Sequence, residues 1–184
     1  PNGTVDTTFT PNFGSTTYDA RVQPDGKILV AGIFTTVNGV NAQRIVRLNM
    51  NGTVDSGFVG QAGDMVSDVE IQADGRVLIV GSFTSVNGFP SINRIASLYP
   101  DGRLNADTNS TILGSPPAVM VSLPNGRTLI GGGFTSVGGA PRQGMARVGW
   151  TGGNDSTFAN PQLTGWVYAI GVQQDGNYIA GGDF

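Results

Sequence analysis

The sequence predicts an all-β protein, a β-propeller built from four-stranded antiparallel blades of about fifty residues each. One hairpin-like stretch, Val22–Phe34 (VQPDGKILVAGIF), returns three more times, and no segment has a sustained helical apolar period. The later copies are Ile71–Phe83, Ser122–Phe134 and Val172–Phe184. Their turn glycines are Gly26, Gly75, Gly126 and Gly176, spaced 49, 51 and 50 residues apart. A fixed period in this range is typical of a repeat architecture.

A second turn recurs in the same register of each unit. It falls at Asn2-Gly3, Asn51-Gly52, Asp101-Gly102 and Thr151-Gly152. Extended segments on both sides of an Asn-Gly or Asp-Gly pair predict a hairpin with a type I′ turn, in which both central residues have positive φ. Two hairpins in fifty residues give four strands, which is the content of one propeller blade.

The units form a single array over residues 1–184. We predict blade units at about 18–58, 66–107 and 118–158, an incomplete unit at 167–184, and at 4–9 the outer strand of a preceding or closing blade. The segment from Thr35 to Gln43, which contains TTVNGV, is predicted to be a loop. The pattern stops before the third strand of the last unit, so we expect a partial propeller whose repeat continues beyond Phe184.

The second strand of each inner hairpin is apolar on both faces, as in Ile28–Ala31 and Val77–Val80. Such a strand must be covered on both sides, and packing between two neighbouring blades provides this cover. A glycine follows each run, at Gly32, Gly81, Gly132 and Gly182. We attribute these glycines to a close approach of neighbouring sheets.

The composition limits the partners that the chain can have. Charged residues make up 12% and the formal net charge is −3, with the 10 basic residues spread thinly along the chain. Nucleic-acid and polybasic membrane contacts need a clustered basic face, so we expect neither. No apolar run approaches the length of a membrane span, so we expect no membrane insertion. An Asn-, Thr- and Gly-rich, charge-poor chain suits an extracellular or cell-surface protein.

The segments VQPDGKILVAG, FTTVNG and RIVRLNMNGTVDSGF resemble the delta-sixty repeat. This is a bacterial and phage-associated propeller repeat of largely unknown function, often found in very large secreted or surface proteins. The resemblance covers almost the whole chain and is most specific in the first two units. It implies a β-propeller with an extracellular, adhesion or structural role and no catalytic residues to transfer. Kelch-type propellers are a weaker resemblance, based on the period and the Gly131-Gly132 and Gly181-Gly182 pairs.

The sequence offers little material for catalysis. It has no histidine and no cysteine, which removes the commonest bases, nucleophiles and metal ligands. Glu70 is the one glutamate, and several aspartates lie in turns. We therefore predict that the protein is not an enzyme, with no catalytic residues, no metal site and no cofactor. Three aspartates recur at one outer position and should pair with Arg47 and Arg147 or cap local backbone donors; they are Asp6, Asp55 and Asp155.

The candidate binding residues lie where the copies differ. The innermost strands carry four charges in the first two units only, at Asp19, Arg21, Asp68 and Glu70. Inner strands line the central channel of a propeller, so these charges either contact a ligand or form ion pairs between blades, and we favour the ion pairs. Trp150 and Trp166 fall in or near loops, where they could bind a sugar or a protein partner, or simply pack locally.

These observations favour a non-catalytic β-propeller scaffold or binding module of an exported surface, adhesin, phage-fibre or filament protein. The expected partner is a protein or a glycan, or another copy of the chain through open sheet edges. The alternative is a carbohydrate-binding, lectin-like propeller that uses loop tryptophans or channel carboxylates.

Overall fold

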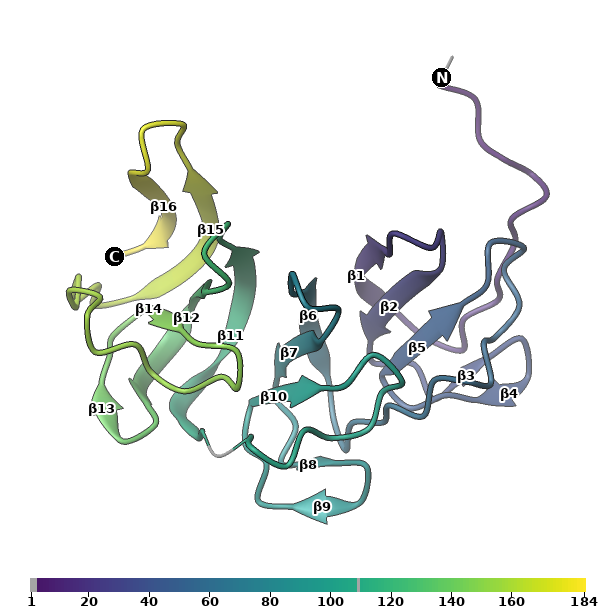
Figure 1. Cartoon of the computed structure of the whole chain (residues 1–184), viewed down its shortest axis with the longest axis horizontal. Coiled ribbons are helices and arrows are strands. Elements are labelled where there is room, and N and C mark those ends of the chain that lie inside the picture. The colour runs from purple at the N-terminus through teal and green to yellow at the C-terminus, as the bar shows by residue number, and fades with distance from the viewer. Residues whose placement is uncertain (1–2, 109) are drawn as a thin grey trace.

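A computed structural model describes residues 3–108 and 110–184. In these ranges the chain forms β-strands and no helix, which confirms the all-β prediction. Figure 1 shows the units side by side in chain order along an open arc, with the last hairpin at one end. The described part contains no helix of the length and apolarity needed to cross a membrane.

Units 1 and 2 have the same layout. Unit 1 contains β1 (Thr17–Val22), β2 (Ile28–Gly32), β3 (Thr36–Val37), β4 (Val40–Asn41) and β5 (Ile45–Leu48). Unit 2 contains β6 (Val66–Ile71), β7 (Val77–Gly81), β8 (Ser85–Val86), β9 (Phe89–Pro90) and β10 (Ile95–Leu98). The main sheets are antiparallel, with orders β1-β2-β5 and β6-β7-β10, and each unit adds a small two-stranded hairpin, β3-β4 or β8-β9.

Units 3 and 4 continue the array. Unit 3 contains β11 (Ile112–Ser122), β12 (Thr128–Val137), β13 (Ala140–Pro141) and β14 (Met145–Val148), and here β12 extends through the small hairpin. Unit 4 is the hairpin of β15 (Trp166–Val172) and β16 (Tyr178–Asp183). The first strands β1, β6, β11 and β15 contact one another in succession on the inside of the arc, and the third strands lie outside (Figure 1).

The predicted fourth strand of each unit is reduced to one bridge. These bridges are Leu48–Val54, Leu98–Leu104 and Val148–Asn154. No strand forms at residues 4–9, where an outer strand was predicted. An aspartate explains the difference, because its side chain accepts a hydrogen bond from the backbone two residues on and bends the chain. Asp6 accepts from Thr8 N at 2.8 Å, and Asp55 from Gly57 N at 3.0 Å.

The prediction of type I′ turns is wrong for the Asp-Gly and Asn-Gly pairs that close the long hairpins. Gly26 has φ +81°, whereas Asp25 is not left-handed. Gly26 N donates to Gln23 O at 2.9 Å and Gln23 N to Lys27 O at 2.8 Å, which gives a three-residue loop ending in a glycine bulge. The same loop forms at Asp74-Gly75, where Ala73 precedes the pair, and at the outer pair Asn51-Gly52, so it does not depend on a preceding proline. Asn2 of the first outer pair lies outside the described residues.

Type I′ geometry occurs instead within the segments predicted to be loops. Asn38 and Gly39 have φ values of 51° and 75°, and they join β3 to β4. Asn87 and Gly88, with 50° and 78°, join β8 to β9 in the same way. An Asn-Gly pair therefore makes a type I′ turn in the small hairpins and a bulged three-residue loop at Asn51-Gly52, although no proline precedes it in either place.

The hydrophobic core lies between the units. Both faces of β2 are covered, and Leu29, Val30 and Ala31 are buried as predicted. Leu29 packs in one cluster with Val69 of unit 2, and the equivalent leucines of units 2 and 3 pack against the following unit. The glycine that follows each apolar strand is required for a different reason from the one predicted. A Cβ on Gly32 would lie 2.3 Å from Thr16 O, so the close neighbour is the first strand of the same hairpin.

Candidate functional site

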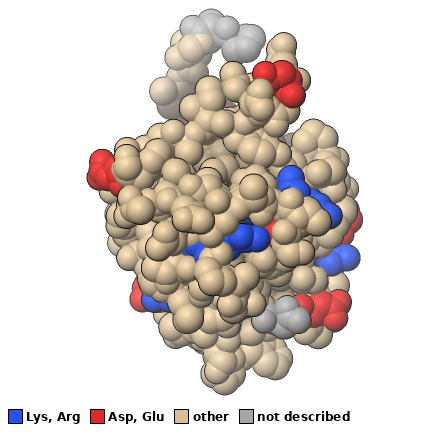
Figure 2. Space-filling model, turned by 90° about the vertical axis from the view of Figure 1, so that its left-hand side faces the viewer, with Lys and Arg blue, Asp and Glu red and all other residues tan. Residues whose placement is uncertain are grey.

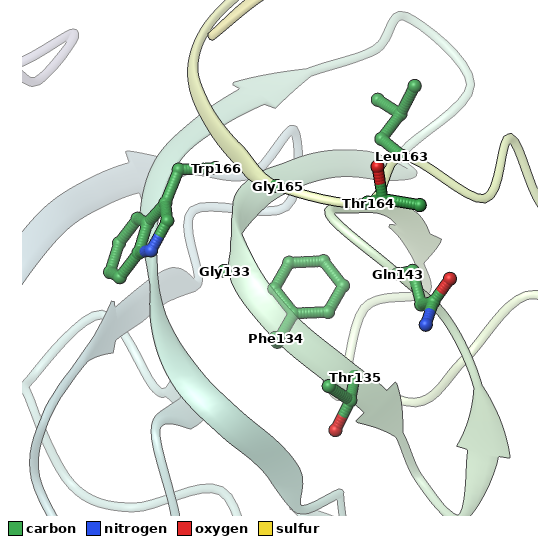
Figure 3. A pocket seen from close by; sticks show the side chains of 8 residues that line it. All are labelled: Gly133, Phe134, Thr135, Gln143, Leu163, Thr164, Gly165 and Trp166. Carbon is green, nitrogen blue, oxygen red and sulfur yellow. The ribbon is translucent and has the colours of Figure 1, made fainter. Parts of the chain in front are cut away.

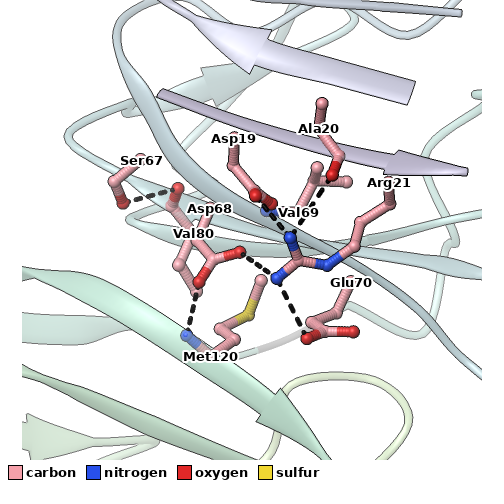
Figure 4. A network of polar contacts seen from close by, with 9 residues as sticks. All are labelled: Asp19, Ala20, Arg21, Ser67, Asp68, Val69, Glu70, Val80 and Met120. Atoms are coloured by element: carbon pink, nitrogen blue, oxygen red, sulfur yellow. Dashed lines mark hydrogen bonds and ion pairs between the residues drawn. The ribbon is translucent and has the colours of Figure 1, made fainter. Parts of the chain in front are cut away.

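Four charged residues meet where unit 1 contacts unit 2. Asp19 and Arg21 alternate along β1, and Asp68 and Glu70 occupy the same register positions on β6. Alternation places each pair on one face of its strand. Because β1 and β6 are neighbours on the inside of the arc, both pairs face the same boundary. We call these residues the inner-strand cluster (Figure 4).

A single guanidinium joins the three carboxyl groups of the inner-strand cluster. Arg21 Nη2 lies 3.3 Å from Asp68 Oδ1 and 3.3 Å from Glu70 Oε1. Arg21 also forms an ion pair with Asp19 on its own strand. These contacts are ion pairs between units 1 and 2, as in the interpretation that the sequence analysis favours.

Two of the carboxylates also bind the backbone of the next unit. Asp19 Oδ2 accepts a hydrogen bond from Val69 N at 3.2 Å, and Asp68 Oδ2 accepts one from Met120 N at 2.6 Å. Asp19 and Asp68 are equivalent positions, so the same contact joins unit 1 to unit 2 and unit 2 to unit 3. Val119 occupies this position in unit 3 and cannot repeat the contact toward unit 4.

The cluster changes the ionisation of one carboxyl group. Burial raises the pKa of Asp68 to about 8, and a hydrogen bond with Asp19 adds to the increase. Asp68 therefore keeps its proton to a higher pH than an ordinary aspartate. The proton lowers the repulsion among three carboxyl groups that share one guanidinium.

A second set of charges recurs on the outer side of units 1 and 3. Arg47 Nε lies 2.6 Å from Asp55 Oδ2, and Arg147 Nε lies 2.6 Å from Asp155 Oδ2. Each arginine also lies over a phenylalanine ring, at 5.2 Å from the centroid. The predicted pairing of outer aspartates with Arg47 and Arg147 is therefore confirmed, while Asp6 caps local donors instead.

The contacts of the outer pair in unit 1 favour the charged form of the Asp55 carboxyl group. A hydrogen bond from Lys27, followed by those from Gly57 N and Arg47, lowers the pKa of Asp55 to about 2 despite its burial. Unit 2 lacks the pair as a whole, because Ser97 replaces the arginine and Asn105 replaces the aspartate. Two partners replaced together indicate that neither charge is tolerated alone at this buried position.

The two tryptophans lie in different settings. A Cβ on Gly126 would lie 2.1 Å from Trp150 Cζ2, so this indole packs against the turn of its own unit. Trp166 stacks on Tyr168 with ring centroids 5.9 Å apart and an interplanar angle of 13°. Trp166 also lines a pocket at the boundary between units 3 and 4. These contacts of the two tryptophans are with residues outside the inner-strand cluster.

Sequence analysis missed Gly144, which lies at the boundary position that Arg94 and Arg44 occupy one and two units earlier. The signal was available in the aligned copies, since the three positions are each 50 residues apart. Among the described residues, no group of three or more His, Cys, Asp or Glu side chains is placed to hold a metal ion.

The comparison with known families covers the repeated part of the chain. A family model described as a domain of unknown function (DUF5122) beta-propeller matches residues 23–58, 72–107 and 123–158. The matched segments leave out the first strands β1, β6 and β11, so the inner-strand cluster lies outside them. No curated protein matches the chain. Because the matched segments cover more than half of the 184 residues, the chain belongs to this beta-propeller family of unknown function.

Proposed function

We propose that the chain is a non-catalytic propeller scaffold that presents loops for binding in an exported surface, adhesin, phage-fibre or filament protein. The inner-strand cluster carries this proposal. Its three carboxyl groups are held by Arg21 and by backbone amides, so the charges best placed for chemistry hold the units together. The resemblance to delta-sixty repeats and the charge-poor composition support the exported setting.

The scaffold role is tested with the double variant Asp68→Ala/Glu70→Ala. We expect a lower melting temperature, because Arg21 loses two partners and Met120 N loses its acceptor. Unchanged melting would contradict the scaffold role of the cluster and would instead favour a ligand site. The location is tested by labelling intact and permeabilised source cells with antibodies against the chain. Labelling that requires permeabilisation would contradict the exported setting.

Glycan binding is a second candidate, favoured by the stacked pair of Trp166 and the exposed Tyr168. Flat aromatic faces suit the apolar faces of sugar rings, and both side chains lie at the surface of unit 4. A glycan array tests this function. Saturable binding that is lost in Trp166→Ala and retained in the matched variant Trp150→Ala would support it, while an array without hits would contradict it.

A further propeller unit fits the outer face of unit 4, and for the 184-residue chain we propose that a second copy supplies it. Ile179 is 57% exposed, whereas Leu29, Leu78 and Leu129 at the equivalent position are fully buried by the following unit. Figure 2 shows that this side of the molecule has few charged side chains. The face of another propeller unit has the matching chemistry, because it already covers these positions inside the chain. Light scattering should show association that Ile179→Lys abolishes; a monomer at all concentrations would contradict it.

A further inference from the structure

A pocket of about 160 Å³ lies between the end of β12 and the segment that leads into β15 (Figure 3). Its volume suits several water molecules or one small polar group. Figure 3 shows the Trp166 indole on one side, Gln143 and Thr164 on the other, and the Phe134 ring between them. The complete lining is Gly133, Phe134, Thr135, Gln143, Leu163, Thr164, Gly165 and Trp166.

The backbone beside the pocket repeats a position that carries arginine in units 1 and 2. Arg44 and Arg94 have φ +66°, and Gly144 has φ +73°. In each case the backbone N donates to the carbonyl of the conserved phenylalanine of its unit, at 2.9, 3.0 and 3.2 Å. The backbone is therefore equivalent at the three positions, and unit 3 differs in lacking the arginine side chain.

The arginine side chain of unit 2 reaches the following unit. Arg94 Nη1 donates to the carbonyl oxygen of Ile112, which begins β11, at 2.8 Å. At the next boundary, Leu163 lies in the segment that enters unit 4. A Cβ on Gly144 would lie 2.9 Å from Leu163 Cβ, 2.9 Å from Leu163 O and 3.3 Å from Gly165 O, so Leu163 takes up the space next to this glycine. The acceptors that an arginine would use thus remain beside Gly144.

A second glycine opens the same space. Gly133 stands where unit 1 has Ile33 and unit 2 has Ser82. A Cβ on Gly133 would lie 2.6 Å from Trp166 Cε2, so the indole can lie on the backbone of β12 only because the side chain is missing. Gly133 therefore leaves room for the Trp166 indole, and the pocket beside it has an aromatic wall, a glutamine amide, a threonine hydroxyl and backbone carbonyls.

We propose that this pocket binds the guanidinium group of an arginine side chain on a partner, at the boundary where unit 3 lacks the arginine that units 1 and 2 carry at Arg44 and Arg94. Carbonyl, amide and hydroxyl oxygens accept hydrogen bonds from its five N–H groups. The weakly hydrated planar cation also stacks on an aromatic face. This inference goes beyond the scaffold role and does not depend on it.

The test uses the two indole N–H signals of the chain in ¹⁵N correlation spectra. N-acetyl-arginine methylamide is titrated against the neutral isostere N-acetyl-citrulline methylamide. We expect a saturable shift of the Trp166 signal, no shift of Trp150, and binding of the citrulline probe weaker by about tenfold or more, since a charge-assisted hydrogen bond is worth at least about 1.4 kcal/mol. No shift at Trp166, or equal shifts with both probes, would overturn the proposal.

Variants of the chain distinguish binding in the pocket from nonspecific binding. Gly144→Arg supplies the chain's own guanidinium and should abolish the Trp166 response, whereas Gly153→Arg adds the same charge at a position with open space and should retain it. If Gly144→Arg does not fold, Gly133→Ser introduces the residue of unit 2, displaces the indole and should also abolish the response. A response that survives closure of the pocket would overturn the proposal.

Discussion

Asp68 links the stability of the protein to pH in a range where few other groups titrate. Its folded-state pKa is about 8, against an ordinary value of 3.8, and burial is the main cause. Between these two values the folded state binds more protons than the unfolded state, so the free energy of unfolding falls as pH rises. The sequence contains no histidine that would mask this effect.

We predict that the free energy of unfolding decreases continuously from about pH 4 to about pH 8. Urea unfolding at several pH values measures this slope. Asp68→Asn keeps the shape of the protonated side chain without a titrating group, so the variant should lose most of the slope and become relatively more stable at pH 8. A slope that is the same in Asp68→Asn would show that another group causes it.

For Asp55 the dependence of the free energy of unfolding on pH has the opposite sign, because its folded-state pKa of about 2 lies below its ordinary value. Its stabilising effect is present above about pH 4 and is lost as pH falls through about 2. The neighbours Arg47 and Lys27 depend on this carboxylate, at 2.6 and 2.8 Å. Removing Asp55 alone leaves both cations without their shared partner.

We predict that Asp55→Asn lowers the free energy of unfolding at pH 7 by about 1–3 kcal/mol. The double variant Arg47→Ser/Asp55→Asn recreates the pair of unit 2 and should cost less than the sum of the two single variants, by about 0.5–3 kcal/mol. Urea unfolding of the four proteins gives this coupling. Additive costs would mean that the two side chains do not stabilise each other.

In units 1 and 2, one asparagine of the small hairpin holds two other segments of the unit together. Asn87 Nδ2 donates to Gly102 O at 2.9 Å, and Asn87 Oδ1 accepts from Gln61 N at 2.8 Å. One left-handed asparagine thus ties the incoming segment of a unit to its outer turn. Asn38 makes the equivalent contacts in unit 1. Unit 3 has Gly138 at this position, with φ +56° and no such side chain.

We predict that Gly138→Asn stabilises the protein by about 0.5–1 kcal/mol, because asparagine tolerates this φ and reduces the freedom of the unfolded chain. The space permits it, since the nearest atom to a Cβ would be Ser110 Oγ at 3.5 Å. Thermal unfolding measures the change. The reverse substitution Asn87→Gly should destabilise the protein. A lower melting temperature for Gly138→Asn would contradict this stabilising role of the asparagine.

At the scale of the whole molecule, stability is distributed over the boundaries between units. Each hydrophobic cluster that joins two units contains side chains from both, so no unit completes its core alone. The boundary before unit 4 lacks the aspartate contact found at the two earlier boundaries, and Ile179 on β16 is exposed. Unit 4 should therefore open most readily.

We predict that amide hydrogen exchange is slowest in β7, which is buried along its whole length, and fastest in β16. Mass spectrometry of exchanged peptides resolves the two strands. If a second copy covers the face of unit 4, protection of β16 should rise with protein concentration. Equal exchange in both strands at low concentration would contradict a stability gradient along the array.

Local sequence patterns are enough to predict the repeat, the long hairpins and the strand that is covered on both faces. These features depend on turn residues and on side-chain alternation, which act over a few neighbouring positions. The type of turn is not among these features, because an Asn-Gly pair forms a bulged loop at Asn51-Gly52 and a type I′ turn at Asn38-Gly39. The aligned copies also contained the change from Arg44 and Arg94 to Gly144, although its meaning was hidden without the structure.

Packing between the units determines which charged residues make contact, which carboxyl group has a raised pKa and where a pocket forms. Arg21 and Asp68 are 47 residues apart and make contact because two units pack side by side. The pKa of Asp68 follows from burial at that boundary, and the pocket beside Trp166 from the missing side chain at Gly133, which faces the next unit. Such properties depend on the distance between units, which no local pattern of residues specifies.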